Sequence, residues 1–295
     1  MGTGVPLFTD RIVVVTGAGS GIGRAVALGF AANGAQVVAA DIDLAAARQT
    51  CAVIESHDAS GLAVQVDVAS AGEMEQFAAW VRAEVGVPDV VVNSAGIAIA
   101  GSFLAHTEDD WQRIVGVNLL GVARSCRLFG AQMVERDAGG HLVNIASAAS
   151  WVPTSALPAY SATKAAVRML SECLRAELAS AGIGVTAICP GFTSTGIARA
   201  AHYVGMSAEQ EDKMREVAAD GLARRRFPPE KVALAVMRAV LADKPVVPVN
   251  AEAWLTYALS RLSPFVLARL VRAADHAMQR VEQSGGRQGS SATRA

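Results

Sequence analysis

Short apolar segments alternate with longer segments of helical periodicity along most of the chain. The apolar segments are near-continuous runs of Val, Ile and Ala, and they predict strands at Ile12–Thr16, Gln36–Asp41, Ala63–Asp67, Val90–Ser94, His141–Ala146, Gly184–Cys189 and Val246–Val249. Helices are predicted between them, near 24–33, 44–57, 70–85, 107–136, 158–181 and 229–242. Strands without polar alternation are buried on both faces. The pattern therefore predicts an α/β domain with one doubly wound parallel sheet of about seven strands and helices on both faces.

Polar and glycine residues follow the predicted strands at the same end of the sheet. Along the chain they are Asp41, Asp67-Val68, Asn93-Ser94-Ala95-Gly96, Ser147 and Pro190-Gly191. Such residues at one strand end are ordinary turn chemistry. In a doubly wound sheet, however, the carboxyl ends of the strands line the ligand crevice. The repeated pattern therefore predicts a binding site along this edge.

A glycine-rich turn follows the first predicted strand. It reads T-G-A-G-S-G-I-G over residues 16–23 and leads into an alanine-rich helix that is expected to end near Asn33. Backbone N–H groups at a helix N-terminus can hold a diphosphate, and glycine lets the ligand approach closely. Asp41 lies about 20 residues further on, where an acid can bind the ribose hydroxyls of an adenosine. Glycine turns also occur without ligands, so the dinucleotide site is predicted from the turn and Asp41 together.

Tyr160 and Lys164 are four residues apart on a predicted helix, which puts them on one face, a turn apart. A tyrosine with a pKa of about 10 is a poor acid or base at neutral pH. A nearby ammonium, together with an oxidised nicotinamide, would lower that pKa and suit it to proton transfer at a hydroxyl or carbonyl oxygen. Such pairs also arise by chance. Ser147, just past a strand end, and Asn118, a bare amide in an apolar helix, make the catalytic interpretation stronger.

Together these motifs resemble the short-chain dehydrogenase/reductase family. The glycine spacing T-G-x-x-x-G-x-G and the order and spacing of the catalytic set match the family over most of the chain. The resemblance implies a Rossmann fold and an NAD-dependent oxidoreductase acting on CH–OH groups. It makes Tyr160 the general acid/base and Ser147 the hydrogen-bond partner of the substrate oxygen. Lys164 would lower the Tyr160 pKa and bind the nicotinamide ribose, and Asn118 would hold a water that extends a proton relay.

The same resemblance assigns the cofactor contacts. Residues 93–96 resemble the family's N-N-A-G, with Ser94 a conservative departure, and residues 190–195 resemble the segment that grips the carboxamide. The implied cofactor-binding residues are Gly17, Ser20, Gly21, Ile22, Gly23, Asp41, Asp67, Val68, Asn93, Ala95, Gly96, Tyr160, Lys164, Pro190, Gly191, Thr193 and Thr195. A carboxylate at Asp41 repels a 2′-phosphate. Neither Ser20 nor Ile42 supplies the basic side chain of NADP-preferring members, so the expected cofactor is NAD.

The composition narrows the class of protein. The 295 residues carry a formal net charge of −1, which argues against nucleic-acid binding. The four cysteines form no C-x-x-C pair and are expected to be reduced thiols, and no histidine spacing indicates a metal site. No secretory signal and no uncharged apolar run of about 18 residues is visible, so we expect a cytoplasmic protein.

The chain is expected to divide into three parts. Residues 1–250 would form the Rossmann domain with the catalytic site and a lid at about 196–227, residues 251–283 a helical extension, and residues 284–295 a disordered tail. Trp151 and Phe192 are expected to line an apolar substrate pocket, and core packing explains them equally well. By resemblance, the helices at 107–136 and 158–181 would pair in a homodimer or homotetramer.

The extension carries apolar residues at helical spacing, interleaved with arginines, and Pro264 is expected to divide it into two helices. The favoured interpretation is a helix pair that covers the substrate cleft or a subunit interface. Weak binding to a membrane surface is the alternative. The basic run Arg224-Arg225-Arg226 is expected to be a solvated face, and binding of an anionic substrate tail is its alternative.

Two rival functions fit part of the sequence. An epimerase or dehydratase of the same superfamily usually carries T-G-x-x-G-x-x-G and a larger sugar-nucleotide domain. A non-catalytic NAD-sensing protein usually lacks the tyrosine or the lysine. This sequence has the other glycine spacing and keeps both Tyr160 and Lys164. We therefore favour an oxidoreductase whose small-molecule substrate is an apolar secondary alcohol or ketone, lipid-, steroid- or acyl-like.

Overall fold

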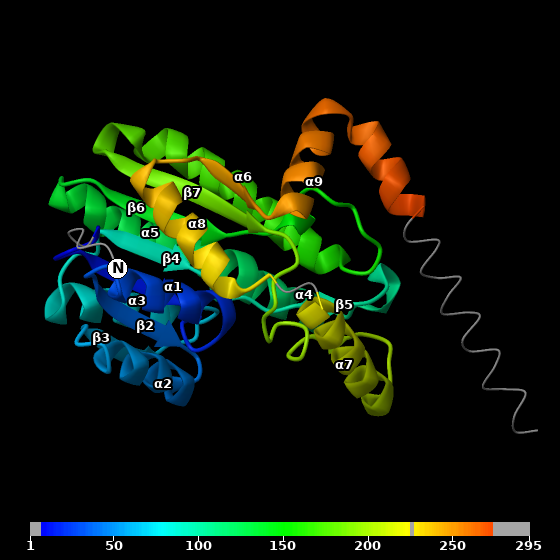
Figure 1. Cartoon of the computed structure of the whole chain (residues 1–295), viewed down its shortest axis with the longest axis horizontal. Helices are drawn as coiled ribbons and strands as arrows, with labels where there is room; N and C mark the ends of the chain where they lie inside the picture. Colours follow the sequence, from blue (N-terminus) through cyan, green and yellow to red (C-terminus); the bar gives the residue numbers. More distant parts are fainter. Residues whose placement is uncertain (1–6, 225–226, 274–295) are drawn as a thin grey trace, which may run out of the picture.

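A computed structural model describes residues 7–224 and 227–273 of the chain. Its centre is a seven-stranded, fully parallel sheet of order β3-β2-β1-β4-β6-β7-β9 (Figure 1). The strands are β1 (Ile12–Thr16), β2 (Gln36–Asp41), β3 (Gly61–Gln65), β4 (Val90–Asn93), β6 (Gly140–Ile145), β7 (Ile183–Pro190) and β9 (Val246–Val249). The strand order reverses between β1 and β4, so the ligand crevice of such a sheet lies at the carboxyl ends of these two strands.

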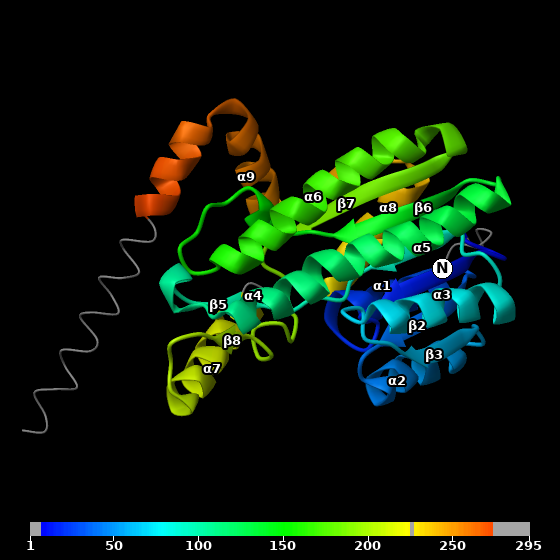
Figure 2. The same ribbon diagram turned by 180° about the vertical axis from the view of Figure 1, so that it is seen from behind.

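Two helical layers cover the sheet. Neighbouring residues of each strand point to opposite faces, and both faces are apolar. Val13 and Val15 of β1 pack on α1 (Gly21–Ala31), α2 (Leu44–Glu55) and α8 (Pro229–Leu241). Val14, between them, packs on the opposite layer of α3 (Ala71–Glu84), α5 (Gly121–Arg136) and α6 (Pro158–Leu178). Figure 2 shows α5 and α6 side by side on this second face. The doubly wound fold predicted from the apolar runs is confirmed.

The helix predicted at 107–136 is interrupted. It consists of α4 (Glu108–Val115), a π turn at Gly116–Leu120 and α5. Among the described residues, the run Glu108–Arg136 is the one helix whose length and composition would allow it to cross a membrane. Phe129 and Met133 of this run are fully buried beneath the sheet. Its apolar character is therefore explained by core packing.

Two short strands were not predicted. β5 (Ile99–Ala100) and β8 (His202–Tyr203) pair in parallel and fasten the segment after β7 to the segment after β4. Two-residue strands are too short to leave a periodic signal. The segment continues into α7 (Ala208–Arg224). The β3 strand begins at Gly61 and ends at Gln65, two residues earlier at each end than predicted. Asp67 therefore lies beyond the strand end rather than at it.

After β9 the chain forms α9 (Ala251–Leu262) and a second helix at 264–273, with the break at Ser263 just before Pro264, as the sequence predicts. These two helices stand away from the sheet (Figure 1). The expected disordered tail at 284–295, the end of the extension at 274–283, and Arg225 and Arg226 lie outside the described residues.

Candidate active site

The turn between β1 and α1 is built for glycine. Gly17 and Gly21 have φ of 66° and 51°, in the left-handed region. A Cβ added at Gly17 would lie 2.7 Å from the Ala95 backbone, and one at Gly23 would lie 2.0 Å from the Gly17 carbonyl oxygen. The N-cap residue Ser20 makes no side-chain capping bond, and the first turn of α1 contains no acid. The N–H groups at the start of α1 therefore face no competing carboxylate within that turn and suit an anionic group such as a diphosphate.

Asp41 is held at the rim of this turn. Its Oδ2 accepts a hydrogen bond from the Gly19 N–H at 2.8 Å, and its Oδ1 accepts one from the Asp43 N–H at 3.0 Å. A Cβ at Gly19 would come within 2.9 Å of Oδ2, so glycine is needed for this approach. Two backbone donors fix the carboxylate as an acceptor group beside the glycine turn. The ribose hydroxyls of a dinucleotide are donors that fit it.

The segment after β4 closes the turn from the other side. Thr16 Oγ1 accepts hydrogen bonds from Ser94 N–H at 3.2 Å and Ala95 N–H at 3.4 Å. Asn93 is buried, and its amide donates to Asn144 Oδ1 on β6 at 2.8 Å. The Nδ2 group of Asn93 thus joins two strands, while its buried Oδ1 has no hydrogen-bond partner among the described residues.

The residues after β3 form a local turn. Asp67 Oδ1 accepts from Ala69 N–H at 2.9 Å, and Asp67 N–H donates to Glu73 Oε2 at 2.9 Å. Val68 is buried, and a Cβ at Gly121 would come within 2.9 Å of its side chain. The predicted adenine contacts at Asp67 and Val68 therefore sit on a turn whose Asp67 carboxylate already has a backbone partner.

Ser147 and Tyr160 come together at the carboxyl end of β6. Ser147 caps the short helical turn Ala148–Ser150, where its Oγ accepts from Ala149 N–H at 3.1 Å. Its hydroxyl faces the phenol of Tyr160, which projects from the first turn of α6. Burial raises the pKa of Tyr160, and the neighbouring Ser147 hydroxyl acts in the opposite direction.

Lys164 lies one turn further along α6. Its side chain is only 4% exposed, and Nζ donates to the Ile145 carbonyl oxygen at 2.9 Å. Nζ is 5.7 Å from the centroid of the Tyr160 ring. Burial lowers the pKa of Lys164 to about 8. The protein groups alone therefore do not lower the pKa of Tyr160 as expected, because the effect of burial on this pKa is larger than that of its neighbours.

Asn118 sits in the π turn and is fully buried. Its Oδ1 accepts from Ile97 N–H at 2.9 Å, and its Nδ2 donates to Ile97 O at 3.0 Å and Thr163 Oγ1 at 3.3 Å. The amide therefore joins the segment after β4 to α6 and satisfies the partner requirement expected from sequence. A Cβ at Gly96 would lie 3.3 Å from Asn118 Oδ1 and 3.4 Å from Lys164 Nζ, so these two groups converge on Gly96.

The segment after β7 crosses to the glycine turn. Thr193 is buried and its Oγ1 donates to Gly191 O at 3.3 Å, while a Cβ at Gly191 would lie 2.4 Å from Asn250 Oδ1. A Cβ at Gly21 would lie 3.3 Å from Thr195 Cβ. A cavity of about 410 Å³ opens here, lined among others by Gly21, Arg24, Ser194, Thr195, Arg199 and Pro229. Thr195 of the predicted segment and Gly21 of the glycine turn thus border one space.

Trp151 and Phe192 have different surroundings. The Trp151 ring contacts the Tyr257 ring of α9, with centroids 5.2 Å apart. Phe192 is 49% exposed. Trp151 therefore ties the turn that begins at Ser147 to the C-terminal helices.

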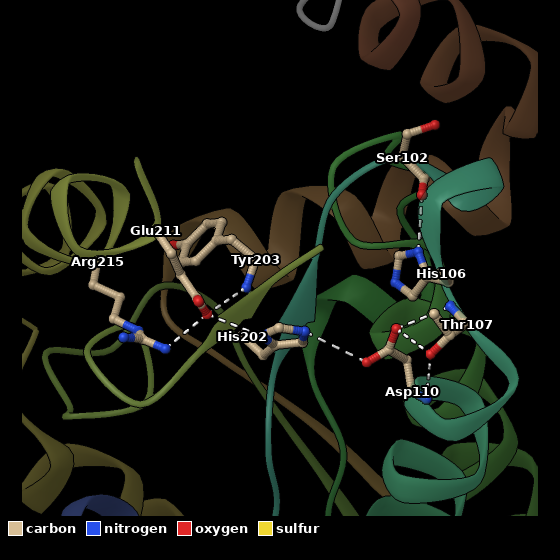
Figure 3. Close-up of polar contacts among 8 residues, drawn as sticks. All are labelled: Ser102, His106, Thr107, Asp110, His202, Tyr203, Glu211 and Arg215. Carbon is tan, nitrogen blue, oxygen red and sulfur yellow. Dashed lines mark hydrogen bonds and ion pairs between the residues drawn. The ribbon is translucent and has the colours of Figure 1, made fainter. Parts of the chain in front are cut away.

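A polar cluster that the sequence did not predict joins α7 and β8, in the segment predicted as a lid, to α4 (Figure 3). His202 Nδ1 is 2.9 Å from Glu211 Oε1 of α7, and His202 Nε2 is 3.5 Å from Asp110 Oδ1 of α4. Glu211 Oε1 also accepts from Tyr203 N–H at 3.0 Å and Arg215 Nη2 at 2.7 Å. The pKa values of Asp110 and Glu211 are lowered, for Glu211 chiefly by the Tyr203 N–H. Only the T-x-x-D capping box at 107–110 left a local sequence signal.

No group of three or more metal-ligating side chains comes together among the described residues. The four cysteines are free, and three of them are buried.

Comparison with known proteins gives consistent results. A family model described as short chain dehydrogenase matches residues 11–203. "Probable oxidoreductase EphD" of Mycobacterium tuberculosis is 45% identical over 90% of this chain, but the chain spans only 45% of that relative's length. "Short chain dehydrogenase/reductase astE" of Aspergillus oryzae is 34% identical, with 77% of this chain and 86% of the relative covered.

Solved structures agree. A short chain dehydrogenase/reductase from Burkholderia phymatum in complex with NAD has a TM-score of 0.76 and 28% identity, covering 85% of this chain and 93% of that one. A short-chain dehydrogenase from Streptomyces avermitilis has a TM-score of 0.74 and 29% identity, covering 94% and 99%.

Proposed function

This chain belongs to the short-chain dehydrogenase/reductase family of oxidoreductases, and on that premise we propose that it is an NAD-dependent dehydrogenase of an apolar secondary alcohol or ketone. The observation that carries the proposal is the position of the Tyr160 phenol beside the Ser147 hydroxyl, with the buried ammonium of Lys164 one helical turn away. A hydroxyl and a phenol at one point can both bind the same substrate oxygen, which general acid/base catalysis requires.

In the proposed reaction, Tyr160 moves the proton of the substrate hydroxyl and Ser147 orients the substrate oxygen. Burial holds the pKa of Tyr160 above its ordinary value, so the phenol is protonated at neutral pH without a further positive charge nearby. When bound, an oxidised nicotinamide would supply that charge and the hydride-accepting chemistry. Lys164, held by Ile145 O, would keep its ammonium beside the tyrosine and the nicotinamide ribose.

The residues around the glycine turn fit such a cofactor. Gly17 and Gly23 let the turn pack closely on the Ala95 backbone and on itself, and Thr195 lies across from Gly21 at the start of α1. We propose NAD rather than NADP, because the fixed carboxylate of Asp41 would face a 2′-phosphate with like charge. The neighbouring Ile42 is exposed and supplies no cation.

The proton relay would use the backbone of Asn118 rather than its side chain. Both polar atoms of the amide are already bonded within the protein, to Ile97 and Thr163. A water bound at the carbonyl of the π turn would lie next to the Lys164 ammonium. We propose this as the route by which a proton leaves the site.

We also propose a homo-oligomer formed through α5 and α6. These neighbouring helices (Figure 2) expose large apolar side chains, among them Val134 and Met169. A self-complementary apolar face of this kind is typical of an isologous interface.

The test is turnover of NAD with a panel of apolar secondary alcohols, followed by the absorbance of NADH. Tyr160→Phe should lower kcat by roughly 100-fold to 10,000-fold, the usual contribution of a positioned acid/base, and should still bind NAD. Tyr203→Phe, which removes the same oxygen from the lid, is the matched control and should retain turnover. NAD binding by the wild type without turnover of any alcohol or ketone would instead support a nucleotide-sensing protein.

A further inference from the structure

The two helices after β9, residues 251–273, present an unusually apolar surface; we name it the C-terminal hairpin. Five large apolar side chains of the hairpin are between 55% and 85% exposed: Trp254, Leu255, Leu262, Phe265 and Leu270. Isolated exposed apolar residues are normal on a protein surface, but a run of them on one projecting element indicates a contact surface.

The same hairpin is basic. Arg261, Arg269 and Arg272 are exposed, and its one acid among the described residues is Glu252 at the start of α9. Arg261 lies over the Tyr257 ring at 5.7 Å, and Arg269 lies over the Phe265 ring at 5.6 Å. None of the three arginines forms an ion pair within the described part of the chain. The guanidinium groups are therefore available to a partner at the edge of the apolar surface.

We propose that the C-terminal hairpin is the surface by which this protein docks on an anionic lipid bilayer. Apolar side chains that insert at the boundary of the acyl chains, with arginines at headgroup level, are the pattern of interfacial amphipathic helices. A second copy of this chain is a poorer occupant, because an isologous contact would bring the same arginines together with almost no acid to pair them. An anionic headgroup layer is complementary in charge and has no fixed shape to match.

The hairpin is also connected to the site. Tyr257 of α9 contacts Trp151, four residues after Ser147, and Trp254 contacts Tyr257 with centroids 5.9 Å apart. The docking surface and the turn that carries Ser147 are thus connected by consecutive ring contacts through Tyr257. If the proposed apolar substrate is correct, docking would bring the site near the phase in which such a substrate dissolves, but the docking itself does not depend on that function.

The experiment is co-sedimentation of the full chain with phosphatidylcholine vesicles, with and without roughly a third of phosphatidylglycerol, at low and high salt. We expect binding to the anionic vesicles only, and release by salt because the arginine contribution is screened. Arg261→Gln, Arg269→Gln and Arg272→Gln together should lower the partition coefficient about 100-fold, at about fivefold for each cation near an anionic surface. Leu262→Ser with Phe265→Ser should also weaken binding.

The matched control removes three exposed arginines elsewhere, Arg48→Gln, Arg113→Gln and Arg238→Gln, with the same change in net charge. It should bind as the wild type does. Equal loss in the control, equal binding to neutral vesicles, or no binding at all would overturn the proposal. A fall in oligomer mass for the hairpin variants by light scattering, without a change in vesicle binding, would make the hairpin a subunit interface and would also overturn it. Thermal unfolding of every variant checks that each is folded, and turnover of a water-soluble alcohol tests the proposed function separately.

Discussion

Lys164 should make the protein's stability depend on pH in an identifiable way. Its pKa is about 8 in the folded protein, against about 10.4 for an unperturbed lysine. The unfolded chain therefore binds this proton more tightly, which destabilises the folded state by about 3 kcal/mol below pH 8. The destabilisation is relieved as pH rises from the folded pKa towards the unfolded one. By pH 10 most of it, roughly 2–3 kcal/mol, should be gone.

Lys164→Met keeps the length of the side chain and removes the charge. The variant no longer suffers the buried charge, but it leaves Ile145 O without its donor, which costs about 1–3 kcal/mol. The net change at pH 7 is therefore small, and the pH dependence is the diagnostic quantity. The free energy of unfolding of the wild type should rise relative to the variant between pH 7 and pH 10, by roughly 2–3 kcal/mol.

The assay is urea unfolding of both proteins at pH 7, 8, 9 and 10. Cysteines and tyrosines that titrate in this range are common to both proteins and largely cancel in the difference. The control is Lys213→Met, an exposed lysine on α7, whose difference from the wild type should not change with pH. Parallel stability curves for the wild type and Lys164→Met would show that the ammonium is not desolvated as described, and the reasoning would fail.

Three further predictions concern the turn and the lid. Gly23→Ala should abolish NADH binding, measured by fluorescence titration, because its Cβ would fall 2.0 Å from the Gly17 carbonyl oxygen; unchanged binding would contradict the packing of the turn. Asp41→Ser should shift the ratio of kcat/KM for NAD and NADP towards NADP by at least tenfold, about 1.4 kcal/mol, if the carboxylate excludes the phosphate. His202→Phe removes the shared partner of two carboxylates, so α7 should become more sensitive to limited proteolysis, and an unchanged digestion rate would count against the lid contact. Since the Glu211 pKa is lowered, its contribution is present above the ordinary glutamate range and is lost as pH falls through the folded pKa, so wild-type protection should decline in acid.

The central sheet and the glycine turn could be predicted because their signals are local. Buried parallel strands are continuous apolar runs, and the left-handed backbone at Gly17 and Gly21 needs glycine. Both ends of β3 were misplaced by two residues. Gly61 carries no apolar side chain that would mark the start, and Asp67 belongs to the turn after the strand. The end of a strand is difficult to predict from sequence where the following turn begins with extended backbone.

The lid contacts and the state of the catalytic groups could not be predicted, because they depend on residues distant in sequence. His202 meets Asp110 only after β8 pairs with β5, and neither two-residue strand has a periodicity to detect. The raised pKa of Tyr160 follows from burial, which motif spacing does not reveal. The Asn118 amide could be expected to need a partner, but its bonds to Ile97 depend on the π turn.

The amide pair between β4 and β6 bears on how reproducibly the site assembles. Asn93 and Asn144 are register partners, and Asn144 in turn donates to the Ser171 hydroxyl of α6 at 2.9 Å. A shift of one strand by a single residue would leave both buried amides without these hydrogen-bond partners. Each lost partner would cost about 1–3 kcal/mol. Misaligned strand pairings are therefore disfavoured during folding. The correct register fixes the position of the segment after β4 relative to the turn after β6 that begins with Ser147.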